Sequence, residues 1–169
     1  MSLEQVLTIG YEGADPADFL RTLQELNVTL LLDIREIAMS RRKGFAKTAL
    51  REGLHGAGID YRHEPALGSP KRIRHQLRDD GDYGRFFRDF GRHLRTQQPL
   101  LATLADELSG TVVLLCFERD HTQCHRRAVA DALGAIAGLV PQHHGVKPHG
   151  SRQVRPTARA HPRQGLPAA

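Results

Sequence analysis

The chain has 169 residues, a net charge of +5 and 40% hydrophobic residues, which suits one domain with a single hydrophobic core. No segment approaches the roughly 18 continuous apolar residues that a membrane-spanning helix requires. The N-terminus, "MSLEQVLTIGYEG", lacks the basic region and apolar stretch of a secretory signal, so we expect a cytoplasmic protein. Because such proteins rarely keep disulfides, we expect its two cysteines to be reduced thiols.

The positive charge is unevenly distributed along the chain. Residues 141–169 contain five Lys or Arg and no acidic residue, whereas the other 19 Lys and Arg balance the 19 Asp and Glu. This segment also contains five of the nine prolines, so we expect a disordered tail after an α/β domain over residues 1–140. A basic tail attracts nucleic acid non-specifically, and the alternative is a tail that is only solvated. Residues 35–95 hold 15 Lys and Arg against 8 Asp and Glu, which predicts a basic surface.

The first elements form a strand, helix, strand unit. "VLTIG" (6–10) is typical of a short strand, and "DPADFLRTLQELN" predicts a helix with Asp15 as N-cap and Pro16 in its first position. "VTLLLDI" (28–34) is nearly all apolar, as in a strand buried on both faces of a sheet. The crossover between these two strands is expected to be right-handed.

The rest of the chain continues this alternation. A basic loop over 35–45 is followed by expected helices over 46–56, 83–95, 100–108 and 122–135, and by expected strands at the start of 59–68 and over 111–117. The sum is one small α/β domain with a mostly parallel, Rossmann-like central sheet flanked by helices. Polar residues follow each expected strand, at the edge where such sheets carry their sites: Tyr11, Glu12, Asp33, Arg35, Tyr61, His63, Glu64, Cys116 and Glu118.

The segment "LLCFERDHTQCHRRAVADAL" (114–133) carries both cysteines and permits several chemistries. A zinc site is not favoured, because C-x4-H-x2-C-H matches no common zinc pattern and adjacent helical residues such as Cys124 and His125 point about 100° apart. A disulfide is not favoured either, because the spacing is not the C-x-x-C of redox helices. Cys116 ends a buried strand, where a cysteine is usually a small core residue.

Cys124 is expected in the first turn of the last helix, with Asp120 or Thr122 as its cap. There the helix dipole and Arg126 would stabilise a thiolate, and the same features with His125 would bind an oxyanion. We favour anion binding over a cysteine nucleophile. An ordinary capped helix with exposed arginines is the alternative.

Two further groups of residues suit phosphate chemistry. In "DIREIAMSRRKGF", the donors Arg35, Ser40 and Arg41, followed by Arg42 and Lys43, suit phosphate recognition, and a solvated basic loop is the alternative. Glu118 is a candidate general acid or base, or else only a partner for a nearby arginine. For Glu12 and Glu64, surface solvation is the favoured interpretation.

Several motifs together resemble the DUF488 family over roughly residues 5–135. They are "TIGYEG", "LLDIRE", "SRRKGF", "IDYRHEPALG" and "LLCFERDHTQCHRRAVADAL". The resemblance places family positions at Gly10, Asp33, Arg35, Ser40, Arg41, Tyr61, Leu67, Gly68, Cys116, Glu118, Cys124, His125 and Arg126. It implies a small α/β protein and names no reaction. Tyr11 and Glu12 depart from the family, in which "TIGHS" is a frequent reading.

The sequence thus predicts a hydrolase-like site for a phosphate-bearing substrate, such as nucleic acid, a nucleotide or a phosphorylated small molecule. The expected catalytic residues are Glu118 and Cys124, and the expected anion-binding residues are Arg35, Ser40, Arg41, Tyr61, His125 and Arg126. No dinucleotide fingerprint, Walker loop or metal-ligand set appears, so we expect no cofactor or metal, and no membrane partner. The alternatives are a non-catalytic nucleic-acid or nucleotide binding module, and a thiol redox protein using Cys124.

Overall fold

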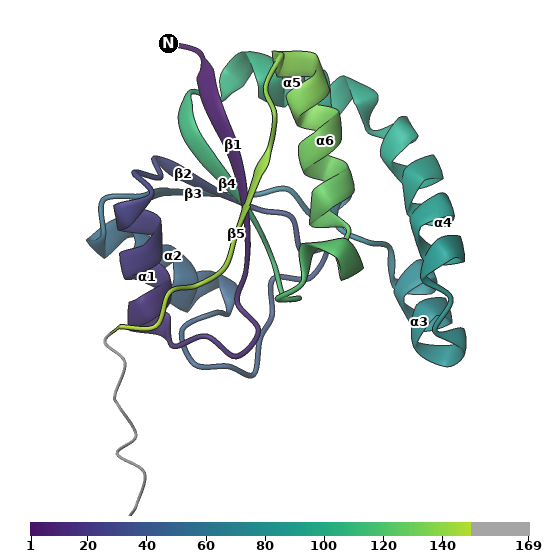
Figure 1. The fold of residues 1–169 in the computed structure, drawn as a ribbon, viewed down its shortest axis with the longest axis horizontal. Coiled ribbons are helices and arrows are strands. Elements are labelled where there is room, and N and C mark those ends of the chain that lie inside the picture. The colour runs from purple at the N-terminus through teal and green to yellow at the C-terminus, as the bar shows by residue number, and fades with distance from the viewer. Residues whose placement is uncertain (150–169) are drawn as a thin grey trace, which may run out of the picture.

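Strands and helices alternate along residues 1–149, the part of the chain that the computed structural model describes (Figure 1). The strands are β1 (Leu3–Gly10), β2 (Leu30–Asp33), β3 (Asp60–His63), β4 (Gly110–Cys116) and β5 (Gln142–His144). The α-helices are α1 (Pro16–Glu25), α2 (Lys47–Gly56), α3 (Lys71–Asp80), α4 (Tyr83–Thr96), α5 (Gln98–Glu107) and α6 (Arg126–Ala137). Short 3₁₀ helices at Pro65–Leu67 and His121–Gln123 follow β3 and β4.

The five strands form one sheet in the order β3-β2-β4-β1-β5, and every neighbouring pair is parallel. This confirms the expected α/β fold, with a fully parallel sheet where the sequence indicated a mostly parallel one. Helices cover both faces (Figure 1), which explains why β2 and β4 are nearly continuous apolar runs. Side chains alternate along β4, so that Val112 and Leu114 belong to one core cluster and Val113 and Leu115 to the other.

The two core clusters divide the helices between the faces. On one face, Phe19 and Leu23 of α1 and Leu54 of α2 pack against the sheet, and on the other face α4, α5 and α6 contribute Phe90, Leu101 and Leu133. The chain leaving β2 proceeds to α2 and the β3 edge, whereas the chain leaving β4 proceeds to α6 and the β5 edge. The two connections diverge, and such a switch point opens a crevice at the carboxyl ends of the strands.

The first helix begins as its sequence predicts. Asp15 has an extended backbone and its side chain accepts hydrogen bonds from the N–H groups of Ala17 and Asp18, at 2.9 and 3.1 Å. Pro16 occupies the first helical position, where a missing N–H costs nothing. These contacts confirm the predicted cap.

Two elements of the structure were not predicted from the sequence, helix α3 and strand β5. Helix α3 has only two apolar residues, Ile73 and Leu77, and buries only Ile73, so its apolar stripe is too short to predict a helix. Strand β5 is only "QHH" and lies within residues 141–169, which were expected to be disordered; it pairs with β1 along Leu7–Ile9, and Thr8 Oγ1 lies 2.7 Å from His143 Nδ1. The expected tail is therefore wrong for residues 142–144, and residues 150–169 lie outside the described part of the chain.

Gly10 ends β1 where the chain after β4 passes directly over it. A Cβ at this position would lie 1.8 Å from the carbonyl oxygen of Glu118 and 2.9 Å from Nη1 of Arg126. Neither the Glu118 backbone nor the buried Arg126 guanidinium can move aside for an added methyl group. Gly10→Ala is therefore expected to lower the free energy of unfolding by about 1–3 kcal/mol or more. Urea denaturation measures this change.

Gly56→Ala is the matched control for this substitution. Gly56 ends α2, and a Cβ there would meet nothing within 4 Å. Alanine at that position should leave stability unchanged or raise it by up to about 1 kcal/mol. Equal effects of the two substitutions would contradict the close approach at Gly10.

Candidate functional site

A cavity of about 690 Å³ opens at the carboxyl edge of the sheet, next to the switch point between β2 and β4. Four stretches of chain line it: Tyr11 after β1, residues 35–42 after β2, residues from 69 to 86 around α3, and residues from 116 to 125 after β4. Sites for small molecules commonly occupy about 300–1,000 Å³, so this cavity has the size of one.

Positive charge dominates the lining. Five arginines line the cavity against the two carboxylates of Glu36 and Glu118; the arginines are Arg35, Arg41, Arg42, Arg74 and Arg78. Arg41, Arg42 and Arg78 are exposed and Arg74 is half-buried, so these four guanidinium groups are accessible to a bound anion. Guanidinium groups bind phosphate and carboxylate through paired N–H donors.

The rim of the same cavity is apolar. Ile37, Met39, Tyr83 and Phe117 line it, although their side chains are 52, 77, 41 and 44% exposed. Exposed apolar groups that gather at one place commonly mark a binding surface.

Ser69 is a buried polar residue in the lining, only 3% exposed, and its Oγ has no hydrogen-bond partner among the described residues. Its carbonyl oxygen accepts a hydrogen bond from Arg74, whose Nη1 also lies 3.5 Å from Glu36. An unpartnered buried hydroxyl costs free energy, so the Ser69 Oγ is available to bond to a water or to a polar group of a ligand beside Arg74.

Asp33, at the end of β2, is fully buried and binds two other predicted residues. Its carboxylate accepts bonds from Arg35 Nε and Nη2, at 2.8 and 2.7 Å, and from the Tyr61 hydroxyl at 2.6 Å. Arg35 Nη1 donates to the Tyr11 hydroxyl at 3.2 Å and to the Phe45 carbonyl at 2.6 Å. Four of the five N–H donors of Arg35 are therefore used within the protein, which holds its charge in place in the cavity wall.

Burial and this hydrogen bonding shift two pKa values. Burial alone would lower the pKa of Arg35, but its bonds to Asp33 raise it above its usual value. Burial raises the pKa of Tyr61 well above 10, and the hydrogen bond to Asp33 raises it further. Both groups thus keep their protons at any pH at which the protein works.

Arg126 was expected to bind an anion, and the structure places it beneath the cavity floor, 1% exposed. Its guanidinium donates to the backbone carbonyls of Glu118 and Arg119 and to Thr8 Oγ1, the last at 3.2 Å. It makes no ion pair with any of residues 1–149, and burial lowers its pKa to about 10. Arg126 therefore connects β1, the loop after β4 and α6.

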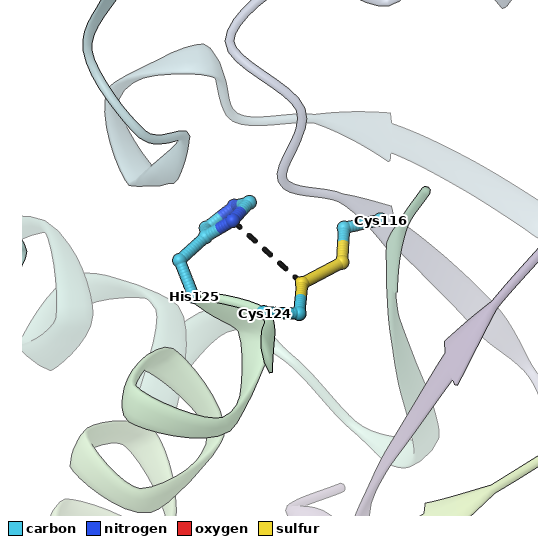
Figure 2. A group of neighbouring side chains, drawn as sticks. All are labelled: Cys116, Cys124 and His125. Atoms are coloured by element: carbon cyan, nitrogen blue, oxygen red, sulfur yellow. Dashed lines mark hydrogen bonds between the residues drawn. A yellow bond between two sulfur atoms is a disulfide. The ribbon is translucent and has the colours of Figure 1, made fainter. Parts of the chain in front are cut away.

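The two cysteines form a disulfide, so the expectation of free thiols is wrong (Figure 2). After β4 the chain turns back through the 3₁₀ helix at His121–Gln123, which brings Cys124 beside Cys116. The bonds from Arg126 to the carbonyls of residues 118 and 119 stabilise that turn. Eight positions of separation suit this fold-back, although they do not fit a C-x-x-C helix.

Cys124 does not lie in the first turn of a helix, contrary to the sequence prediction. Asp120 caps the 3₁₀ helix, accepting from the Thr122 N–H at 2.9 Å, and Cys124 has an extended backbone. Helix α6 begins at Arg126, four residues later than expected, and the Arg126 N–H points to Cys124 Sγ at 3.4 Å. No anion cradle of the expected form therefore exists at Cys124.

His125 lines the inner end of the cavity and is 8% exposed. Its Nε2 lies 3.0 Å from the Ile34 carbonyl, which can only accept, so Nε2 carries the proton and Nδ1 is turned toward Cys124 Sγ at 3.7 Å (Figure 2). Burial lowers the pKa of His125 to about 4, so the ring is neutral at neutral pH.

Glu118 also lines the cavity, and its Oε2 lies 3.3 Å from Cys116 Sγ. Burial raises the pKa of this carboxyl above its ordinary value, and Arg126 lowers it by a smaller amount. A carboxyl that keeps its proton to higher pH can donate that proton to a bound substrate.

The structure brings five of the eight predicted site residues to the cavity wall: Arg35, Ser40, Arg41, Glu118 and His125. Tyr61, Cys124 and Arg126 lie behind that wall and contact its members. Ser69, Arg74 and Arg78 were not predicted as site residues, because helix α3 was not predicted. The excess of Lys and Arg over residues 35–95 pointed to the two arginines, and no sequence signal pointed to Ser69.

These observations define an all-parallel α/β protein with an arginine-lined cavity at the carboxyl edge of its sheet. The family model described as "Domain of unknown function DUF488" matches residues 15–133. The chain belongs to this family, as its motifs indicated. Comparison with curated proteins and with solved structures finds no match. Among the described residues, no helix has the length and apolar character needed to cross a membrane.

Removing the buried carboxylate should be costly. Asp33→Asn leaves the Arg35 guanidinium buried without its counter-charge, and breaking such a pair lowers the free energy of unfolding by about 3–5 kcal/mol. Glu107→Gln is the control, because it breaks the exposed pair with Arg62, worth at most about 1 kcal/mol. Chemical denaturation of both variants tests this, and a small loss for Asp33→Asn would show that Arg35 finds another partner.

The raised pKa of Tyr61 has a measurable consequence at alkaline pH. The folded state holds the phenol proton more tightly than the unfolded state does, so stability should fall as pH rises above about 10. Near pH 10 the tyrosinate absorbance of the folded protein should equal that of the folded Tyr61→Phe variant, because Tyr61 does not ionise there. A normal titration of Tyr61 would contradict its hydrogen bond to Asp33.

Proposed function

We propose that the cavity binds the nucleoside-phosphate part of a nucleotide or of a single-stranded nucleic acid, and that the protein hydrolyses a phosphate-bearing substrate there. One observation supports this most directly: in a cavity of about 690 Å³, five arginines lie beside an exposed aromatic and aliphatic rim. A nucleotide combines the same two properties, since it carries a phosphate anion and a flat base.

The phosphate would bind near α3 and the loop after β2. Arg41 and Arg74 present guanidinium groups to the cavity, and Ser69 adds a buried hydroxyl without a partner among residues 1–149. Arg35 would contribute mainly its charge, because Asp33, the Tyr11 hydroxyl and the Phe45 carbonyl use four of its five N–H groups. The base would stack on the rim, where Phe117 and Tyr83 offer aromatic faces.

Glu118 is the candidate general acid or base. Its carboxyl lines the cavity, and burial raises its pKa, which suits a group that gives a proton to a leaving oxygen. The arginines would stabilise the negative charge that develops on the phosphate oxygens during hydrolysis.

Ligand binding is tested first, by calorimetric titration with nucleoside monophosphates, ribose 5-phosphate and short single-stranded oligonucleotides. Arg74→Ala should weaken all of these ligands about 10- to 100-fold, because it removes charged hydrogen bonds. Phe117→Ala should weaken the ligands that carry a base and leave ribose 5-phosphate unchanged.

The control is Arg72→Ala, on the same helix but outside the cavity lining. Arg72→Ala changes the charge of α3 by the same amount as Arg74→Ala. Because Arg72 does not line the cavity, Arg72→Ala should leave the dissociation constants within about twofold of those of the unaltered protein. Equal losses for the Arg72 and Arg74 variants would indicate a diffuse basic surface. The cavity would then not be the site.

Turnover is tested separately with phosphomonoester and phosphodiester substrates that bind. Glu118→Gln should lower the rate constant about 10²- to 10⁴-fold and leave the dissociation constant nearly unchanged. Binding without turnover by the unaltered protein would contradict hydrolysis and favour a non-catalytic binding module.

A second candidate function is thiol redox chemistry, which the Cys116–Cys124 disulfide favours. Both cysteines are 1% exposed, so a protein partner could reach their sulfurs only if the edge of the sheet opens. If the disulfide serves such chemistry, a dithiol should reduce it in the folded protein within minutes. Reduction that requires denaturant would contradict this role.

A further inference from the structure

We propose that Cys116, Cys124 and His125 bind a divalent cation of the zinc class when the disulfide between the two cysteines is reduced. The Sγ atoms and the His125 ring nitrogen lie within 4.8 Å of one another, and all three residues are buried (Figure 2). Zinc binds thiolate sulfur at about 2.3 Å and imidazole nitrogen at about 2.0 Å, so atoms that share one ion lie within about 4 Å of each other. The 3.7 Å between Cys124 Sγ and His125 Nδ1 already meets this requirement.

The geometry answers the objection raised by the sequence. Adjacent residues on a helix cannot easily bind one ion, but Cys124 has an extended backbone and precedes α6. His121, the other histidine of the segment, lies outside the cluster, where its ring stacks on His143 at 4.0 Å. The four-residue pattern considered in the sequence is therefore replaced by three ligands.

His125 is oriented as a metal ligand requires. Its Nε2–H donates to the Ile34 carbonyl at 3.0 Å, which fixes the tautomer and leaves the Nδ1 lone pair directed at the sulfurs. Histidines that bind metals almost always donate their second ring N–H to a carbonyl or carboxylate in this way.

The surroundings of the sulfurs suit thiolates. The Arg126 N–H lies 3.4 Å from Cys124 Sγ, and its Nη1 lies 3.5 Å from Cys116 Sγ. Two thiolates and one divalent cation sum to zero charge, so binding would add no net charge to this buried place.

Three protein ligands leave one coordination position, and two of the three ligands line the cavity. Cys116 and His125 both line the cavity, and Glu118 lies beside them with Oε2 3.3 Å from Cys116 Sγ. An open position is typical of catalytic zinc sites, whereas structural sites use four protein ligands. The metal site is independent of the ligand proposed for the cavity, and the two are tested by different measurements.

The disulfide and the metal exclude each other. Reduction adds two electrons and two protons to the sulfurs. A phosphine reductant supplies the electrons and takes an oxygen atom from water, whose two protons pass to the thiols. A divalent cation then binds and releases both thiol protons, so uptake should weaken as pH falls.

The test uses the full chain, reduced with a phosphine and freed of it without oxygen. Titration with Co²⁺ should saturate at one equivalent and produce the absorption bands of thiolate-bound cobalt, and Zn²⁺ should displace the cobalt. The oxidised protein should bind neither ion, and this comparison needs no substitution. Cys116→Ser and Cys124→Ser should abolish the bands, and His125→Gln should weaken binding about 10-fold or more.

His121→Gln is the matched control and should bind both ions like the unaltered protein. Circular dichroism checks that each variant is folded. The proposal is overturned if the reduced protein binds no cobalt, or if binding persists in the Cys116→Ser, Cys124→Ser double variant. Neither result bears on nucleotide binding, which is measured on the oxidised protein.

Discussion

The guanidinium of Arg126 is buried at the carboxyl edge of the sheet and connects three parts of the chain. It bonds to Thr8 on β1 and to the carbonyls of Glu118 and Arg119 after β4, and its own backbone begins α6. A buried guanidinium must have all its polar neighbours in place, because an unsatisfied charge in the interior is costly. The loop after β4 is therefore fixed, and with it the positions of Glu118, Cys116 and His125 at the cavity.

A second buried arginine fixes the other side of the same edge. Asp33 at the end of β2 binds Arg35 and Tyr61, which ties β3 and the loop over residues 35–45 to the sheet. Because the strands are all parallel and their connections diverge between β2 and β4, these two anchored loops border one crevice. The cavity is thus a consequence of topology, and the two arginines determine its shape.

Much of this fold is readable in the sequence. The buried strands have continuous apolar runs, α1 has a cap and α4 has an apolar stripe, and each gives a local signal. Helix α3 and strand β5 have no such signal, since α3 buries only Ile73 and β5 is "QHH". Both elements depend on tertiary contacts, because β5 pairs with β1 and α3 packs against α4.

The site was likewise predicted only in part, where local sequence signals pointed to its residues. Residues at strand ends, such as Arg35 and Glu118, were found because the carboxyl edge of a parallel sheet gathers polar groups. Sequence could not show that Arg126 turns inward, or that a 3₁₀ turn places Cys124 beside Cys116. Arg74 lies on α3 and Ser69 lies in the loop just before it, so both were missed along with that helix.

A crystal structure with a nucleoside 5′-monophosphate bound would show most directly whether the cavity binds the phosphate of a nucleotide. We expect the phosphate beside Arg74 with an oxygen accepting from the Ser69 hydroxyl, and the base against Phe117 or Tyr83. A ligand located on the outer surface of α3 and α4, with the cavity unaltered, would contradict it.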